Sequence, residues 1–69
     1  QRELYTRAVQ EIMEMKGKYR EVLIYRLSFD MSFHEIAEIM GIKENSAKVI
    51  YHRGKNMIRG RMEEYGDDR

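Results

Sequence analysis

Apolar side chains recur every three or four residues along most of this 69-residue chain, and residues 28–31 interrupt the pattern. The spacing predicts four helices, near residues 3–15, 18–28, 32–40 and 43–64. Gly17 is the only breaker between the first two helices, and β-branched residues are few in the second. The sequence therefore predicts an all-α fold, a small domain of four helices.

The size of the chain restricts what it can do. A chain this short forms one domain with a thin core, because only about 60% of the unfolded surface is buried at this length. It opens on Gln1 rather than on methionine, so we expect residues 1–69 to be a single domain excised from a longer protein. No arrangement typical of a nucleophile, a phosphate loop or an acid–base pair is present in the sequence. We therefore expect no enzyme activity, no cofactor and no small-molecule substrate.

Residue usage argues against several kinds of site. Cysteine is absent, which excludes disulfides and thiolate metal sites. His34 and Glu38 have the i, i+4 spacing of metal ligands, but two ligands do not make a site, so we expect no bound metal. No apolar run approaches the 18 residues of a membrane span, and no signal peptide opens the chain. These features favour a cytoplasmic protein without membrane insertion.

The middle of the chain carries the most specific local signals. Ser32 and Glu35 have the spacing of a capping box at a helix start, and Gly41 ends the same helix because glycine enters the left-handed region without steric cost. Ala37 is small enough for a steep crossing of two helices, and Ile42 supplies an apolar side chain after the turn. Together these residues predict a helix-turn-helix with a long C-terminal recognition helix.

The last predicted helix has two unlike faces. Its apolar stripe repeats at helical spacing through Ala47, Tyr51, Gly54, Ile58 and Met62. Because Gly54 falls on this stripe, we expect another helix to pack closely there. The other face carries side chains that can enter a major groove and contact base edges or phosphates. These candidates are Glu44, Asn45, Ser46, Lys48, Val49, His52, Arg53 and Lys55.

Charge is unevenly distributed along the chain. Residues 41–62 contain six basic residues and one acidic residue, a net charge of +5, whereas residues 1–40 carry −1 and residues 63–69 carry −3. A near-neutral body with one basic segment fits a polyanionic partner. A solvated helix face, or a helical hairpin that only packs, would give the same pattern, and the charge alone leaves these interpretations open.

Three segments of the sequence, YREVLIYR, MSFHEIAEIMGI and ENSAKVIYHRGKNMIR, together resemble region 4 of bacterial RNA polymerase sigma factors, most closely the extracytoplasmic-function group. The resemblance covers roughly Leu4 to Met62 and depends on the order and spacing of common motifs. It implies a domain that binds the promoter −35 element and directs RNA polymerase to transcription start. The implied partners are double-stranded promoter DNA and the polymerase core.

The resemblance also implies roles for single residues. Positions that face the −35 element are matched by Lys48, Val49, His52 and Arg53, and those of the N-terminal turn of the recognition helix by Glu44, Asn45 and Ser46. Contacts to the DNA backbone are implied for Arg26, Ser32 and Phe33. The sequence departs from the family pattern at Val49 and Ile50, where Ser and Arg are common, at Tyr51, where Leu is usual, and at Gly54, where Ala is usual.

Two other functions stay open at the level of sequence. The DNA-binding domains of LuxR-type response regulators have similar Arg-Glu-Val-Leu and Glu-Ile-Ala segments, and a sigma-like protein-interaction module without DNA binding would keep the same fold. Apolar residues beside the main stripes, Tyr5, Val9, Met13 and Ile24, are expected to remain partly exposed and to dock a protein. The resemblance implies the flap of the polymerase β subunit and an anti-sigma factor as candidates.

Overall fold

The computed structural model describes the backbone of residues 2–67 and the side chains of residues 3–63. It contains four helices: α1 (Arg2–Glu14), α2 (Gly17–Leu27), α3 (Phe33–Met40) and α4 (Glu44–Asp67). The described part of the chain has no strand, which confirms the all-α prediction. The predicted helix bounds agree with the observed ones to within three residues.

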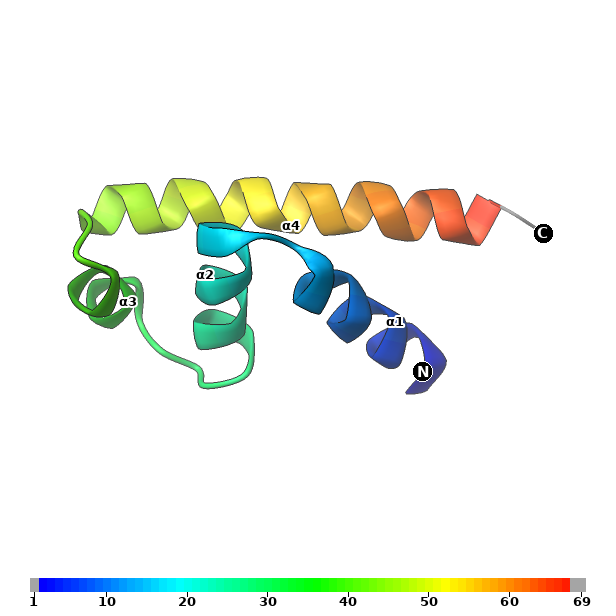
Figure 1. Cartoon of the computed structure of the whole chain (residues 1–69), viewed down its shortest axis with the longest axis horizontal. Coiled ribbons are helices and arrows are strands. Elements are labelled where there is room, and N and C mark those ends of the chain that lie inside the picture. The colour runs from blue at the N-terminus through cyan, green and yellow to red at the C-terminus, as the bar shows by residue number, and fades with distance from the viewer. Residues whose placement is uncertain (1, 68–69) are drawn as a thin grey trace.

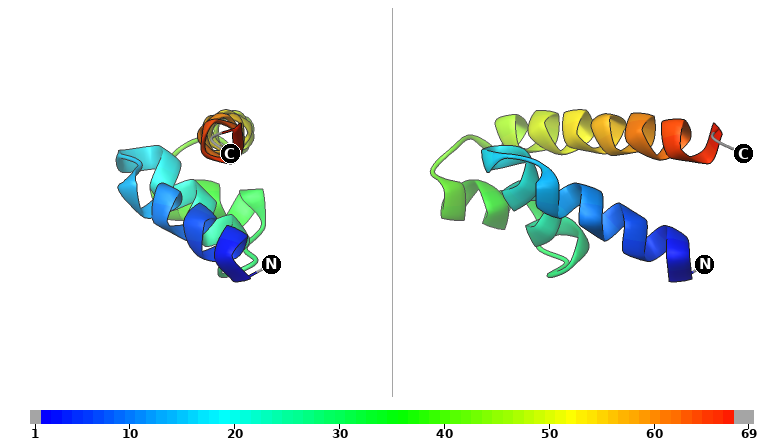
Figure 2. Two further views of the ribbon diagram at one scale, coloured as in Figure 1. Left: turned by 90° about the vertical axis from the view of Figure 1, so that its right-hand side faces the viewer. Right: turned by 45° about the vertical axis from the view of Figure 1, so that its right-hand side comes forward.

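The helices are arranged on one side of α4. Figure 1 shows α4 running along the whole length of the molecule, with α1, α2 and α3 below it and α2 crossing it steeply. The views in Figure 2 show that α1 diverges from α4 toward its N-terminus. One side of α4 is therefore covered by the other helices, and its opposite side is left open.

The core lies where α2, α3 and the first half of α4 meet. Val22 and Leu23 of α2, Ile36 of α3 and Ala47 of α4 are almost completely buried. Burying a side chain the size of valine, leucine or isoleucine stabilises a fold by about 1.5–3 kcal/mol, so these residues supply much of the cohesion of a small domain. Half-buried apolar residues surround them: Tyr25, Met31, Phe33, Met40, Ile42, Ile50 and Tyr51.

A glycine permits the close approach of α2 to α4. A Cβ atom at Gly54 would lie 3.1 Å from Cδ1 of Leu23, which is tighter than ordinary van der Waals contact. Gly54 thus provides the space that Leu23 occupies, and the expectation of close helix packing at this position is confirmed. The glycine lowers the helix propensity of α4 by roughly 1 kcal/mol against alanine, a cost that the burial of Leu23 offsets.

Both ends of α3 have the predicted local structure. The Ser32 Oγ accepts a hydrogen bond from the Glu35 amide at 3.1 Å, and the Glu35 carboxylate accepts one from the Ser32 amide at 2.9 Å. Gly41 ends α3 in the left-handed region at φ 69° and ψ 35°, and the amide of Ile42 donates to the carbonyl of Ala37 at 3.0 Å. The capping box and the glycine turn are both confirmed.

Gly41→Val should destabilise the domain by about 1–3 kcal/mol, because a β-branched residue is strained at a left-handed φ. For a domain of this size each kcal/mol lowers the melting temperature by about 4–8 °C, which thermal unfolding followed by circular dichroism would detect. Gly41→Asn is the matched control, since asparagine tolerates the left-handed region, and it should melt close to the wild type. Equal melting temperatures for the valine and asparagine variants would contradict the argument.

Two leucines that helical periodicity aligns with buried residues of the same helix are exposed. Leu4 is 54% exposed because it lies near the end of α1 that diverges from α4, and Leu27 is 56% exposed because it ends α2 beyond the core. Tyr5 is exposed, as expected, and Met31 packs against the core. Helical periodicity gave the right faces in the middle of each helix and failed at the ends, where no neighbouring helix reaches.

Candidate nucleic-acid interface

The open side of α4 carries the predicted contact residues. Every one of these side chains is exposed in the structure: Glu44, Asn45, Ser46, Lys48, Val49, His52, Arg53 and Lys55. On the covered side of the same helix, Ala47 and Gly54 are buried and Tyr51 is half-buried. The predicted division of the helix into two faces is confirmed, and the role of the exposed residues in binding DNA stays a prediction.

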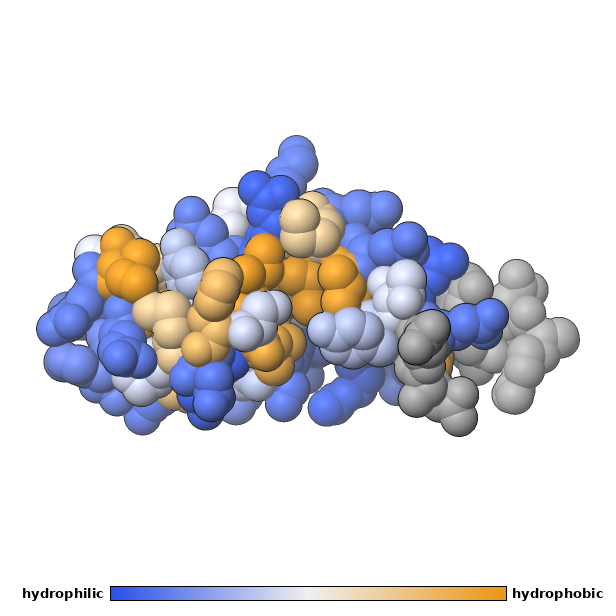
Figure 3. Space-filling view, turned by 90° about the horizontal axis from the view of Figure 1, so that it is seen from below, coloured by the Kyte–Doolittle hydropathy of each residue, from blue (hydrophilic) through white to orange (hydrophobic). Residues whose placement is uncertain are grey.

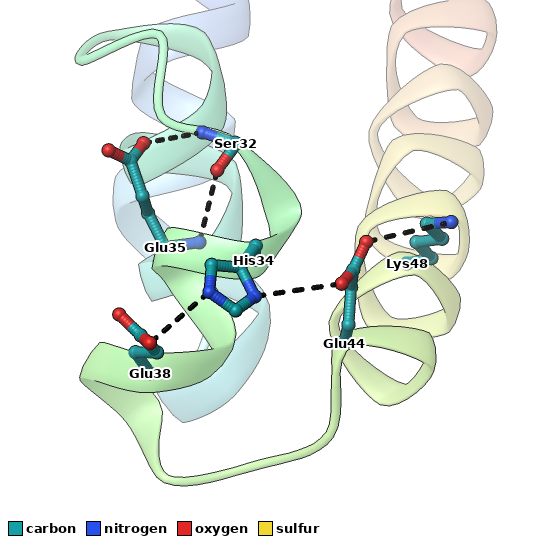
Figure 4. A network of polar contacts seen from close by, with 6 residues as sticks. All are labelled: Ser32, His34, Glu35, Glu38, Glu44 and Lys48. Atoms are coloured by element: carbon teal, nitrogen blue, oxygen red, sulfur yellow. Dashed lines mark hydrogen bonds and ion pairs between the residues drawn. The ribbon is translucent and has the colours of Figure 1, made fainter.

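A polar network joins α3 to α4 across the turn that connects them (Figure 4). His34 of α3 lies between two carboxylates, with Nε2 at 3.2 Å from Glu38 and Nδ1 at 3.8 Å from Glu44. Glu44 also lies 3.9 Å from the amine of Lys48, and its position in the first turn of α4 is favourable to the helix dipole. Among the described residues no group of three or more metal-ligating side chains could hold an ion. The network therefore ties α3 to α4 and places the Glu44 carboxylate beside His34 and Lys48.

The basic residues of α4 lie on two different surfaces, the open side of the helix and the side that faces α1. Arg61 forms an ion pair with Glu11 of α1 at 2.7 Å and lies 3.9 Å from Glu14. It thus links the second half of α4 to α1, away from the turn. The net charge of +5 counted from the sequence overstates the charge on the open face near the turn, because Arg61 faces the carboxylates of α1.

Arg26, expected to contact the DNA backbone, has partners inside the domain. Its guanidinium donates a hydrogen bond to the Met31 carbonyl at 2.8 Å and lies over the Phe33 ring, 4.7 Å from the ring centroid. These contacts fix the connection between α2 and α3. Ser32, also assigned to the backbone, is exposed at the start of α3, while Phe33 is half-buried beside it.

An aromatic contact between α3 and α4 was not expected from the sequence. The rings of Phe33 and Tyr51 meet edge to face with centroids 5.3 Å apart, and Tyr51 meets His52 in the same way at 5.4 Å. The amine of Lys55 lies 5.3 Å from the centroid of Tyr51. The i, i+4 spacing of Tyr51 and Lys55 was a signal for the last contact, but the approach of Phe33 depends on tertiary structure.

The comparisons with known proteins identify the family of this fold. Residues 5–58 match the family Sigma-70, region 4. The chain belongs to this family. It is similar to two proteins of Bacillus subtilis (strain 168). The RNA polymerase sigma factor YlaC is 37% identical over 60 residues, which cover 80% of this chain and 35% of the relative. The ECF RNA polymerase sigma factor SigW is 33% identical over 57 residues, which cover 83% of this chain and 30% of the relative. No solved structure matches the chain significantly.

Membership of the sigma-70 region 4 family favours a sigma factor over a LuxR-type response regulator, a choice that the sequence pattern left open. It also agrees with the expectation of no enzyme activity, since the family is non-enzymatic. The region 4 domain described here spans about a third of the length of the relatives it matches. None of the helices in the described residues is long and apolar enough to cross a membrane.

Proposed function

We propose that this region 4 domain binds the −35 element of bacterial promoters and thereby directs RNA polymerase to transcription start. The observation that carries the proposal is the row of exposed polar and basic side chains on α4, which begins directly after the Gly41 turn. In a helix-turn-helix the N-terminal residues of the second helix reach the base edges of the major groove. The proposed setting is the bacterial cytoplasm, where promoter DNA is found.

Each candidate residue has a role that suits its chemistry. Asn45, Ser46, His52 and Arg53 have donors that can read base edges, and Glu44 can accept from cytosine. Val49 offers an apolar contact to a thymine methyl group. Lys48 and Lys55 suit phosphates, as does Ser32 at the N-terminus of α3. Arg26 and Phe33 complete the proposed backbone contacts, with the internal partners of Arg26 limiting its reach.

Selection from a pool of duplexes with a short randomised core tests the proposal. The 69-residue chain should enrich a common core, because several side chains on one helix face read adjacent base pairs together. The matched control is the Arg53→Ala variant, which should relax the preference at one base pair while leaving the others. Recovery of unrelated cores by the wild type would contradict sequence-specific binding and would favour the alternative of a sigma-like protein-interaction module.

The proposal includes two protein partners, the flap of the polymerase β subunit and an anti-sigma factor. Its support is apolar surface: Leu4, Tyr5, Val9 and Met13 of α1 are all exposed. Figure 3 shows apolar side chains gathered over the middle of the face that is turned away from α4. Exposed apolar patches on soluble proteins mark docking sites. A partner bound there would leave the open side of α4 free for DNA.

Charged substitutions on α1 test the docking part of the proposal. Val9→Asp and Met13→Glu should leave the fold and DNA binding unchanged, because both side chains are exposed. Binding of the purified β flap should fall at least tenfold in a pull-down or by calorimetry. The half-buried Ile24 is less suitable as a probe, since a charge there would also disturb packing. Unchanged flap binding by both variants would contradict the proposed docking surface.

A further inference from the structure

Three helices are joined by a continuous stack of one guanidinium and two aromatic rings, the Arg26–Phe33–Tyr51 stack. Arg26 belongs to α2, Phe33 opens α3, and Tyr51 lies on α4. The guanidinium carbon lies 4.7 Å from the Phe33 centroid, and the Phe33 and Tyr51 centroids are 5.3 Å apart at an interplanar angle of 65°. Both distances and the tilted geometry are those at which the ring quadrupole makes such contacts attractive.

The covered end of the stack is held firmly. Phe33 and Tyr51 both pack against the buried cluster formed by Val22, Ile36 and Ala47. Arg26 is fixed as well, because its guanidinium donates to the Met31 carbonyl at 2.8 Å. The position of the Tyr51 ring is therefore determined by contacts from α2 and α3, and not by α4 alone.

The open end of the stack reaches two residues of the candidate nucleic-acid interface. The Tyr51 and His52 centroids lie 5.4 Å apart at an interplanar angle of 66°, and the Lys55 amine lies 5.3 Å from the Tyr51 centroid. His52 and Lys55 are both exposed. An exposed side chain loses rotamer freedom when it binds, so a neighbour that already restricts it reduces that loss.

We infer that Tyr51 is a positioning residue for DNA readout: its ring, fixed by Phe33, which Arg26 holds in turn, orients the His52 imidazole and the Lys55 amine toward the groove. The inference rests on the proposed function and adds a residue that does not itself touch DNA. A side chain of similar size without a ring would fill the same space but would offer neither the edge-to-face contact to His52 nor the attraction for Lys55.

The experiment compares Tyr51→Leu with Tyr51→Phe in the 69-residue chain. Leucine keeps an apolar side chain and removes the ring, whereas phenylalanine keeps the ring and removes only the hydroxyl. The probes are a duplex carrying the core selected by the wild type and a duplex of the same length with that core scrambled. Two quantities are measured: the ratio of the two affinities, and the NMR chemical shifts of the His52 ring protons in the free domain, which respond to the ring current of Tyr51.

Tyr51→Leu should lower the affinity ratio by about five- to tenfold, part of the discrimination that one good base contact gives, and should move the His52 signals. Tyr51→Phe should keep the affinity ratio within about twofold of the wild type, a smaller change than the loss of one base contact would cause. It should also leave the His52 signals close to their wild-type positions. Tyr25→Leu is the matched control, because Tyr25 is another half-buried tyrosine beside the core whose ring contact is to Phe29, outside the stack. It should leave the His52 signals and the ratio unchanged.

The outcomes separate the inference from the proposed function. If the wild type selects a core and Tyr51→Leu keeps the same ratio and the same His52 signals, the inference is wrong and the proposed function stands. If the wild type selects no core, both are overturned. If Tyr51→Leu fails to fold, Phe33→Leu removes the ring that contacts Tyr51 from α3. An unchanged affinity ratio in that variant would equally overturn the inference.

Discussion

Leu23→Ala should unfold much of this domain, lowering the free energy of unfolding by about 2–5 kcal/mol. Leu23 is almost completely buried, and its side chain occupies the space that Gly54 leaves on α4, so its removal creates a cavity between the two helices. At about 0.05–0.15 kcal/mol per residue a domain of this length has roughly 3–10 kcal/mol of stability in total. Urea unfolding followed by circular dichroism measures the loss.

Leu27→Ala provides the matched control for this prediction. It removes the same side chain from the same helix one turn later, at a position that is exposed. Because little apolar surface is buried there, we expect a change within about 0.5 kcal/mol. Similar losses for the two variants would contradict the assignment of the core to the contact of α2 with α4.

Arg53→Ala and Lys48→Ala should weaken DNA binding and leave the fold intact, because both side chains are exposed on α4. An arginine that reads a guanine edge contributes about 1–3 kcal/mol of discrimination, so Arg53→Ala should weaken binding to the selected duplex by about 5- to 150-fold and to a scrambled duplex far less. A lysine on a phosphate carries no sequence information, so Lys48→Ala should weaken both duplexes evenly. Fluorescence anisotropy with labelled duplexes measures both effects.

Arg61→Ala tests whether DNA affinity depends on the total positive charge of α4 or on the face of the helix that carries the charge. Arg61 also lies on α4, but it pairs with Glu11 at 2.7 Å and so faces α1. Its loss should reduce stability slightly, since an exposed ion pair contributes about 0–1 kcal/mol, and should leave DNA affinity nearly unchanged. Equal losses of DNA affinity in the Arg61 and Arg53 variants would show that any positive charge on α4 suffices, which would contradict a defined contact face.

The parts of this fold that could be predicted from the sequence depend on neighbours along the chain. The capping box of Ser32 and Glu35 involves residues three apart, and the end of α3 at Gly41 follows from the conformational freedom of one residue. The buried stripe and the open face of α4 follow from helical periodicity, and Gly54 on that stripe indicated a close helix contact. In each case the information is local and the structure agrees.

The parts that could not be predicted depend on where one helix meets another. Periodicity cannot show where α1 diverges from α4, so the sequence pattern could not indicate that Leu4 is exposed. The net charge of the segment includes Arg61, but the sequence does not show that Glu11 of α1 lies opposite this residue. The contact of Phe33 with Tyr51 likewise requires the angle between α3 and α4, which no spacing in the sequence encodes.

The salt dependence of DNA binding tests the central claim most directly, because an electrostatic contact to phosphates releases counterions in proportion to the number of contacts. The measurement is the affinity of the wild-type domain for the selected duplex across a series of salt concentrations. With two or three phosphates neutralised by Lys48, Lys55 and Arg26, and about −0.9 for each, a plot of log affinity against log salt should have a slope of about −2 to −3, less steep by about 0.9 in Lys48→Ala. A slope near zero, or no binding even at low salt, would contradict the account.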